Sequence, residues 1–148
     1  MLVKLTNNQI SRYWNDIKAH LAYTLSPHME TSGEAFNKVL ENLLLDKSQA
    51  WVIAGEGEDV ATIYAMIITT FTLEETTDTK NLLIYSLSGY HFIPDNLWKD
   101  GMNKIMAYAR GNKCFKVITY TKVKRIIDVA KSLGADTSVT LISWEVKS

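Results

Sequence analysis

The sequence has few of the residues that fix backbone conformation or reveal a compartment: one cysteine, two prolines and seven glycines in 148 residues. The single cysteine, Cys114, cannot form an internal disulfide, which favours a reducing compartment. Sixteen basic and sixteen acidic side chains cancel. No overall field therefore directs the protein to nucleic acid or to an anionic membrane, and any partner is recognised locally.

Long apolar runs are also missing. No stretch approaches the roughly 20 apolar residues of a membrane span, and Met1–Thr6 leads into a helical pattern without the apolar core of a signal peptide. We therefore expect a cytoplasmic protein that has no membrane partner. A hydrophobic content of 47% over 148 residues predicts one substantial core and a single domain, residues 1–148.

The stretch Lys80–Ala135 has the clearest pattern of secondary structure. It predicts a strand at Asn81–Ser88, a connector, a helix at Pro94–Gly111, a strand at Cys114–Thr121 and a helix at Lys122–Leu133 that Gly134 ends. Strands that alternate with amphipathic helices favour a parallel pair joined by a right-handed crossover. Ligands of such sheets bind at the carboxyl ends of the strands, here near Ser88–Ile93 and Tyr120–Lys122.

The flanking residues predict further elements. They are a strand at Leu2–Thr6, a helix that reaches Thr24, a helix at Gly33–Asp46, strands at Gln49–Ala54 and Val60–Thr72, and a last strand at Thr137–Lys147. Thr6 or Asn7, and Ser32, are the expected N-caps. Loose alternation in Val60–Thr72 favours a bulge or a bend.

Large apolar side chains indicate which faces are buried. All four tryptophans, Trp14, Trp51, Trp98 and Trp144, fall on faces expected to lie in the core. Ile127 should flank the sheet as Trp98 does, and Val139 and Leu141 should be core residues of the last strand. Tryptophans scattered without a basic groove do not form a nucleic-acid surface.

The order of strand, two helices, three strands, helix, strand, helix and strand resembles the GNAT acyltransferase superfamily over nearly the whole chain. The closest textual likeness is at Lys122–Gly134, where a strand ending in Thr121 leads to a helix that closes with Ala130-Lys131-Ser132-Leu133-Gly134. This looks like the family's late helix with its terminal glycine. Trp14 with its spaced apolar residues, Gln49-Ala50-Trp51-Val52-Ile53 and Ile84-Tyr85-Ser86-Leu87 are similar to small GNAT-like proteins of tailed phages. The resemblance implies an α/β fold with a mixed, mostly antiparallel sheet, a central parallel strand pair and helices on both faces.

The resemblance also implies a cofactor. In the family, acyl-CoA lies between the two splayed central strands, and its pyrophosphate binds a Gly-rich turn at the N-terminus of the next helix. Acyl-CoA or acetyl-CoA would here contact Tyr85, Ser86, Leu87, Ser88 and Gly89. Gly89 is the only glycine of the turn, and Asp95 places a carboxylate in the first turn of the helix. We therefore expect weak CoA binding, with Lys122, Lys124 and Arg125 as further phosphate contacts or simply a solvated helix face.

The family's acid and base residues are replaced. Val123 and Ala130 stand where the family often has an asparagine and a tyrosine, and the strand before the turn has no acidic residue at the general-base position. The candidate catalytic residues are His91, in the expected cleft, and Tyr120, at the end of the second parallel strand, because both side chains can carry a proton. An ordinary loop histidine and a packed strand-end tyrosine are the alternative interpretations.

Other reactive side chains favour no site. Cys114 has no histidine paired with it in sequence and is interpreted as a small core residue rather than a nucleophile. His20, His28 and Glu30 are spaced too loosely for a metal site, so we expect no metal.

Two classes of function remain open. The first is an acyl-CoA-dependent N-acyltransferase of a small-molecule or protein amine, which acts by proximity and by oxyanion stabilisation from backbone N–H groups of Tyr85–Ser88. The second is a non-catalytic phage structural or assembly protein, in the host cytoplasm or the virion, that uses the fold to bind protein partners or to self-assemble.

Overall fold

The computed structural model describes residues 1–24, 32–54, 63–89 and 92–146. The elements, in chain order, are β1 (Leu2–Lys4), α1 (Asn7–Arg12), α2 (Trp14–Thr24), α3 (Gly33–Leu44), β2 (Ser48–Ala54), β3 (Ile63–Glu74), β4 (Thr79–Gly89), α4 (Asp95–Gly111), β5 (Lys116–Thr119) and α5 (Lys124–Ser132). Judged by length and hydropathy, each helix in the described ranges falls short of a membrane span.

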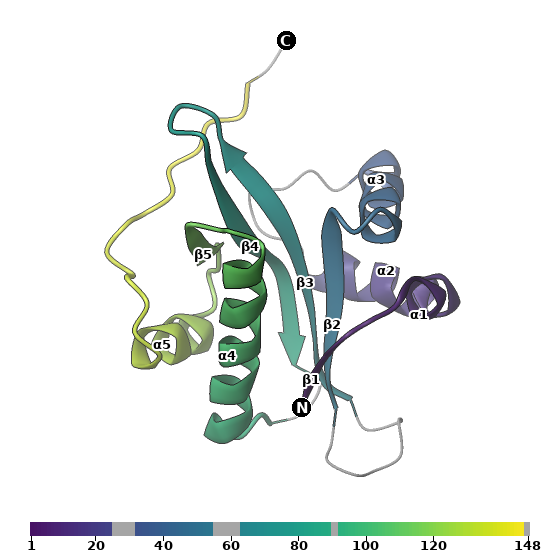
Figure 1. Ribbon diagram of the computed structural model, residues 1–148, viewed down its shortest axis with the longest axis horizontal. Coiled ribbons are helices and arrows are strands. Elements are labelled where there is room, and N and C mark those ends of the chain that lie inside the picture. The colour runs from purple at the N-terminus through teal and green to yellow at the C-terminus, as the bar shows by residue number, and fades with distance from the viewer. Residues whose placement is uncertain (25–31, 55–62, 90–91, 147–148) are drawn as a thin grey trace.

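The strands form one sheet in the order β1-β2-β3-β4-β5 (Figure 1). Neighbours from β1 to β4 are antiparallel, whereas β4 and β5 are parallel and pair from Asn81 with Lys116 to Ile84 with Thr119. The predicted parallel pair and the predicted mixed, mostly antiparallel sheet are therefore confirmed. Helix α4 connects the parallel strands, as a crossover requires.

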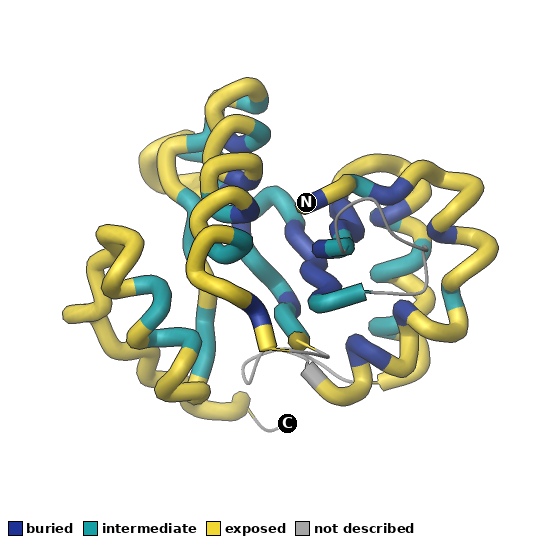
Figure 2. Tube along the Cα trace, turned by 90° about the horizontal axis from the view of Figure 1, so that it is seen from below, coloured by how far each residue is buried: buried dark blue, intermediate teal, exposed yellow. Residues whose placement is uncertain are grey.

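Helices cover both faces of the sheet and enclose two apolar cores. One core lies under α4 and includes Trp51, Leu82 and Ile105. The other lies under α1, α2 and α3 and includes Ile17 and Leu43. Figure 2 shows the buried residues gathered at the sheet, between the two groups of helices.

The helix ends show why these segments begin and end where they do. Thr6 caps α1 through a capping box with Gln9, and the Ser32 hydroxyl accepts a hydrogen bond from Ala35 N at the start of α3. Both are predicted caps. After α5, Gly134 adopts φ +92°, and the amides of Gly134 and Ala135 donate to the carbonyls of Lys131 and Ala130. This is a Schellman motif, which needs a left-handed residue that glycine supplies without strain.

Several predicted elements are longer than the observed ones. The first helix divides at Tyr13 into α1 and α2. Helix α4 begins at Asp95, because Pro94 is its N-cap, and α5 begins at Lys124. Strand β5 spans Lys116–Thr119 rather than Cys114–Thr121, because its hydrogen bonds to β4 extend over only that length.

The expected bulge in the third strand is present. Ile53 pairs with Ala65 and Ala54 pairs with Ile63, so Tyr64 is an extra residue on β3. The turn expected between β2 and β3 lies outside the described residues.

The prediction of a strand at Thr137–Lys147 was wrong for the described part. Residues 135–146 form no strand, and Val139, Leu141 and Trp144 are exposed rather than buried. The alternating pattern meets the side-chain requirement of a strand, but a strand also needs a hydrogen-bonded neighbour. Trp51 is buried as expected, whereas Trp14, Trp98 and Ile127 are only half-buried.

Candidate functional site

The two parallel strands separate toward their carboxyl ends. Their pairing ends at Ile84 and Thr119, where the Thr119 hydroxyl donates to the Ile84 carbonyl (3.0 Å). Strand β4 continues to Gly89 and stays paired with β3. Within the described residues, no strand pairs with β4 on its β5 side from Tyr85 to Gly89, and we call this stretch the open edge of β4.

A β-bulge lies where the separation begins. Ser86 pairs with Ile68 and Ile84 pairs with Thr69, so Tyr85 is an extra residue on β4. The extra residue changes the usual alternation of faces: Tyr85 packs against the core under α1–α3, and its neighbour Ser86 contacts His20 of α2 on the same side of the sheet. Bulges bend and twist a strand, which explains why β4 leaves β5 at this point.

Ser86, beside the bulge, contacts a histidine from α2. Ser86 Oγ lies 2.7 Å from His20 Nε2, and the two residues are only 3% and 4% exposed. Burial lowers the pKa of His20 to about 4, so the imidazole is neutral at physiological pH. The contact holds α2 against β4 and fixes the strand next to the open edge.

A hollow of about 410 Å³ opens on the α3 side of the sheet. It is lined by Glu34, Ala35, Lys38, Val39, Asn42, Ser48, Ile68, Thr70 and Tyr85. Tyr85 alone comes from β4, so the hollow reaches the strand at its bulge. Its lining mixes apolar and polar side chains, which suits a ligand that has both.

Comparisons with known proteins bear on this geometry. No family model and no curated protein matches the sequence. Among solved structures, a probable acetyltransferase aligns with TM-score 0.69 at 12% identity, covering 100% of this chain and 99% of that one. An aminoglycoside N-acetyltransferase in complex with CoA gives TM-score 0.67 at 9% identity with 100% of both chains covered. The glucosamine-6-phosphate N-acetyltransferase of Arabidopsis thaliana gives 0.60 at 17%, with 97% of each covered.

The chain has the GNAT fold. Two observations support this fold. The solved acetyltransferase structures align with this chain over its whole length, and β4 and β5 are parallel and separate after Ile84 and Thr119. The sequence resemblance predicts acyl-CoA along this part of β4, and that location stays a prediction. The predicted contacts all lie on β4 beyond its pairing with β5: Tyr85, Ser86, Leu87, Ser88 and Gly89.

The first turn of α4, the helix after β4, contains both amide donors and a carboxylate. The Pro94 carbonyl accepts hydrogen bonds from Leu97 N (3.0 Å) and Trp98 N (3.2 Å). The amides of Asp95 and Asn96 come before these donors and have no carbonyl to reach within the helix. They point where the helix dipole favours an anion, but the Asp95 carboxylate lies in the same turn and opposes one.

The three basic residues predicted as phosphate contacts, Lys122, Lys124 and Arg125, lie in different environments. Lys124 pairs with Asp128 on the outside of α5 (3.2 Å). Arg125 lies over the ring of Phe92 at 5.3 Å, and Phe92 directly precedes the segment that begins α4. Among these three basic residues, Arg125 therefore lies beside the segment that leads into α4, while Lys122 is exposed after β5.

Of the two candidate catalytic residues, Tyr120 belongs to the described part of the chain. Tyr120 follows β5 directly and is half-buried, at the end of the strand where the gap opens. His91 lies outside the described residues. Cys114 packs against the core under α4, and burial raises the pKa of its thiol, which disfavours a nucleophilic thiolate.

Sequence reasoning missed the pairing of His20 with Ser86. From sequence alone, His20 is interpreted only as a potential metal ligand, although it falls three residues after Ile17 and beside Leu21 on the buried stripe of α2. That position was a signal of a core histidine. Its partner could not be found in the same way, because the two residues are 66 positions apart.

Within the described ranges, no group of three potential metal ligands is present.

Proposed function

We propose that this protein is an N-acyltransferase that moves an acyl group from acyl-CoA to an amine. The observation that carries the proposal is the separation of β4 from β5 at the Tyr85 bulge, within a GNAT fold. Solved structures with this fold are described as acetyltransferases, and one of them is described in complex with CoA.

The open edge of β4 has the central role in the proposal. Bound acyl-CoA supplies an acyl thioester. Backbone groups of residues 85–89 hold it along the strand, and a β4 N–H near the bulge donates to the thioester oxygen as negative charge develops there. The amine nitrogen forms the new bond to the acyl carbon, and the carbon–sulfur bond breaks. Tyr120 donates its hydroxyl proton to the departing thiolate and regains a proton from the amine through water.

The phosphates are held by few groups in this proposal. The Asp95 and Asn96 amides bind them together with Arg125, and Lys122 adds a second, more exposed cation. Asp95 weakens the site by repulsion. The residues therefore fit CoA at the strand edge and fit its phosphates less well, so we propose weak CoA binding.

The acceptor is proposed to be a primary amine that approaches from the hollow under α3. Two of the solved structures are described as acting on aminoglycosides and glucosamine-6-phosphate, which are small amines with hydroxyl groups. Asn42 in the lining offers a hydrogen-bonding amide, whereas the Ser48 hydroxyl donates to Thr70 Oγ1 and the Thr70 hydroxyl donates to the Lys47 carbonyl. Tyr85 connects the hollow to the bulge. A protein amine is the alternative acceptor.

An acetyl-transfer assay with Tyr120→Phe tests the proposal. The protein is incubated with acetyl-CoA and a panel of small amines and peptide N-termini, and acetylated products are measured by mass spectrometry. We expect transfer by the wild type, and a fall in kcat of about 100-fold or more for Tyr120→Phe with KM for acetyl-CoA unchanged. Tyr23→Phe, at an exposed site on α2, is the matched control.

Two results would contradict the proposal. CoA binding without transfer to any amine would mean that the fold binds the cofactor but does not catalyse. Absence of both binding and transfer would favour the non-catalytic docking protein.

A further inference from the structure

Helix α4 contains a buried hydrogen-bond donor that has no acceptor. The Trp98 side chain is half-buried as a whole and packs against the core under α4, but its indole nitrogen Nε1 is buried. Within the described part of the chain, this is the one buried side-chain nitrogen or oxygen that forms no hydrogen bond. Buried polar groups in proteins nearly always have a partner, so an unpaired one needs an explanation.

The other indole of the same core is fully satisfied. Trp51 Nε1 donates to Thr69 Oγ1 (2.9 Å), and the Thr69 hydroxyl donates onward to Gln49 Oε1 (2.8 Å). The sheet itself therefore supplies the acceptor for Trp51. It supplies none for Trp98, although a phenylalanine there would leave no donor unpaired. The contrast favours an acceptor for Trp98 that is not part of this chain.

Trp98 lies at the level at which β4 and β5 have separated. Helix α4 begins at the end of the sheet where β4 ends (Figure 1), and its last turn is fixed before β5, where Cys114 N donates to the Ala109 carbonyl (2.9 Å). Trp98 and Ala109 are roughly 16 Å apart along the helix, at about 1.5 Å per residue. The same distance spans about five residues of β4. It leads from near Leu82, which is paired with β5, to near Leu87, which is not.

Trp98 also lies on the flank of α4 that faces the two parallel strands. Tyr108 is on the other flank, because its ring contacts Trp51 of β2 at 5.1 Å. At 3.6 residues per turn, Trp98 is about 80° around the helix from Tyr108 and close to the direction of Ala109. Ala109 is the residue whose carbonyl binds Cys114, in the segment that leads into β5. The unpaired indole N–H is therefore on the side of the open edge of β4.

We propose that Trp98 is a further binding residue of the acyl-CoA site, whose indole N–H donates to an amide carbonyl of the pantetheine arm beside the open edge of β4. The inference rests on the proposed function, because it takes CoA as the ligand. A phosphate of CoA is the other acceptor to consider. The donor is buried under α4, however, and a neutral carbonyl enters a buried site at a lower cost than a charged phosphate.

The unpaired state of the donor determines how much the contact contributes. Most hydrogen bonds between a protein and a ligand replace hydrogen bonds to water, so their net effect on affinity is small. The Trp98 N–H is buried without a partner before the ligand binds, so its hydrogen bond to the ligand replaces none. Trp98→Phe keeps an aromatic ring and removes the N–H. We therefore expect it to weaken CoA binding about 10-fold.

Indole NMR signals test the contact itself. In protein with nitrogen-15-labelled tryptophan, the Trp98 signal is identified by its loss in Trp98→Phe. We expect CoA to move the Trp98 indole proton downfield, as a new hydrogen bond does, and adenosine 3′,5′-bisphosphate, the nucleotide half of CoA, to leave it in place. The exposed Trp144 and the Thr69-bonded Trp51 are internal controls. A Trp98 signal that moves equally with the nucleotide half would assign the donor to a phosphate and overturn the proposal.

Affinity and stability measurements with a matched variant complete the test. Trp51→Phe removes an indole N–H that is already bonded within the sheet, so it should lower the denaturation midpoint more than Trp98→Phe and leave CoA affinity unchanged. NMR titration with CoA measures the affinities. Unchanged CoA affinity in Trp98→Phe would overturn the proposal.

Failure of this inference can be distinguished from failure of the proposed function. If CoA binds and the Trp98 signal does not move, the role of Trp98 is wrong while acyl transfer is unaffected. If the signal moves but no amine is acetylated, the role of Trp98 is supported and the enzyme activity is contradicted. Absence of CoA binding would overturn both.

Discussion

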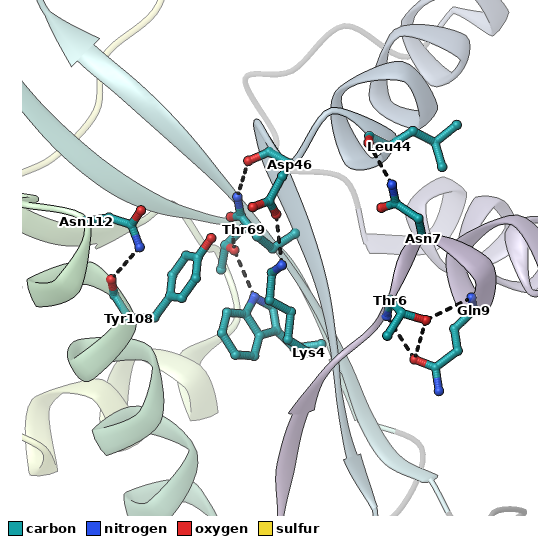
Figure 3. Close-up of polar contacts among 11 residues, drawn as sticks. Lys4, Thr6, Asn7, Gln9, Leu44, Asp46, Thr69, Tyr108 and Asn112 are labelled. Carbon is teal, nitrogen blue, oxygen red and sulfur yellow. Dashed lines mark hydrogen bonds and ion pairs between the residues drawn. The ribbon is translucent and has the colours of Figure 1, made fainter.

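Thr69 is the residue on which the buried polar network depends. The Trp51 indole N–H donates to Thr69 Oγ1 (2.9 Å), and the Thr69 hydroxyl donates to Gln49 Oε1 (2.8 Å). Gln49 Nε2 donates in turn to the Asp46 carbonyl (3.0 Å), and the Asp46 carboxylate pairs with Lys4 (2.9 Å). Figure 3 shows this connection from the sheet interior to the turn before β2. Asp46 has φ +60°, and the network holds it in that conformation.

Replacing Thr69 by valine keeps the shape and removes the hydroxyl. Two buried groups, Trp51 Nε1 and Gln49 Oε1, then lose their partners, and each unsatisfied group costs about 1–3 kcal/mol. We expect Thr69→Val to lower the free energy of unfolding by about 2 kcal/mol or more in urea titrations. Thr69→Ser retains the hydroxyl and should cost clearly less. Equal losses would contradict this role of the hydroxyl.

His20 should make stability depend on pH. Its pKa falls from 6.5 in the unfolded chain to about 4 in the folded one, because burial disfavours the charged imidazole. Below pH 6.5 the unfolded state takes up a proton that the folded state does not, so the free energy of unfolding falls until about pH 4 and is unaffected above 6.5. By pH 5 the loss amounts to about 2 kcal/mol.

His20→Gln removes this titration. An amide can still bond to Ser86, so we expect the variant to lose less stability than the wild type between about pH 7.5 and about pH 5. Urea titrations at both pH values measure the difference. The same loss in both proteins would show that another group is responsible.

Asp95 should limit CoA affinity. Its carboxylate lies in the first turn of α4, where like-charge repulsion of a phosphate costs about 1 kcal/mol. We expect Asp95→Asn to tighten CoA binding about five-fold at low salt, and the gain should shrink as salt is added. Asp100→Asn, an exposed carboxylate further along the same helix, is the control. An equal gain in both variants would indicate a general charge effect rather than a phosphate site.

At the scale of elements, two glycines next to helix ends should respond oppositely to substitution. Gly134 has φ +92°, which an L side chain adopts only with strain, so Gly134→Ala should cost about 1 kcal/mol. Gly111, at the end of α4, has no positive φ and nothing within 4 Å of an added Cβ. Gly111→Ala should therefore stabilise the protein slightly, by at most about 1 kcal/mol. Denaturation midpoints measure both, and shifts of the same sign would contradict the assignment of the α5 cap.

Element types could be predicted where hydrophobic periodicity was strong and local. The spacing of Ile105 and Ala109 indicated α4, and both are buried. The Ser32 cap followed from local chemistry in the same way. The ends of strands could not be predicted in this way. Strand β5 ends where β4 bends away from it, and the bend depends on the bulge at Tyr85, which local hydrophobic periodicity does not indicate. Residues 137–147 show the limit most clearly, since their alternation indicates a strand but cannot supply its neighbour.

At the scale of the whole molecule, the order of elements was sufficient for the topology. A strand, a helix and a second strand in a right-handed crossover leave few alternatives to the parallel pair, and β4 and β5 form it. The open edge of β4 also followed from that order. The environment of Arg125 did not, because its position over Phe92 depends on how α5 packs near the beginning of α4. The roles proposed for Tyr120, His91, Lys122 and Lys124 stay predictions.

A calorimetric titration with CoA tests most directly whether the open edge of β4 is a cofactor site. We predict saturable binding of one CoA per chain that is weak, with Kd on the order of 0.1–1 mM. Arg125→Ala should weaken it further, whereas Lys131→Ala at the other end of α5 should not. Heat that is absent at millimolar CoA would contradict the account.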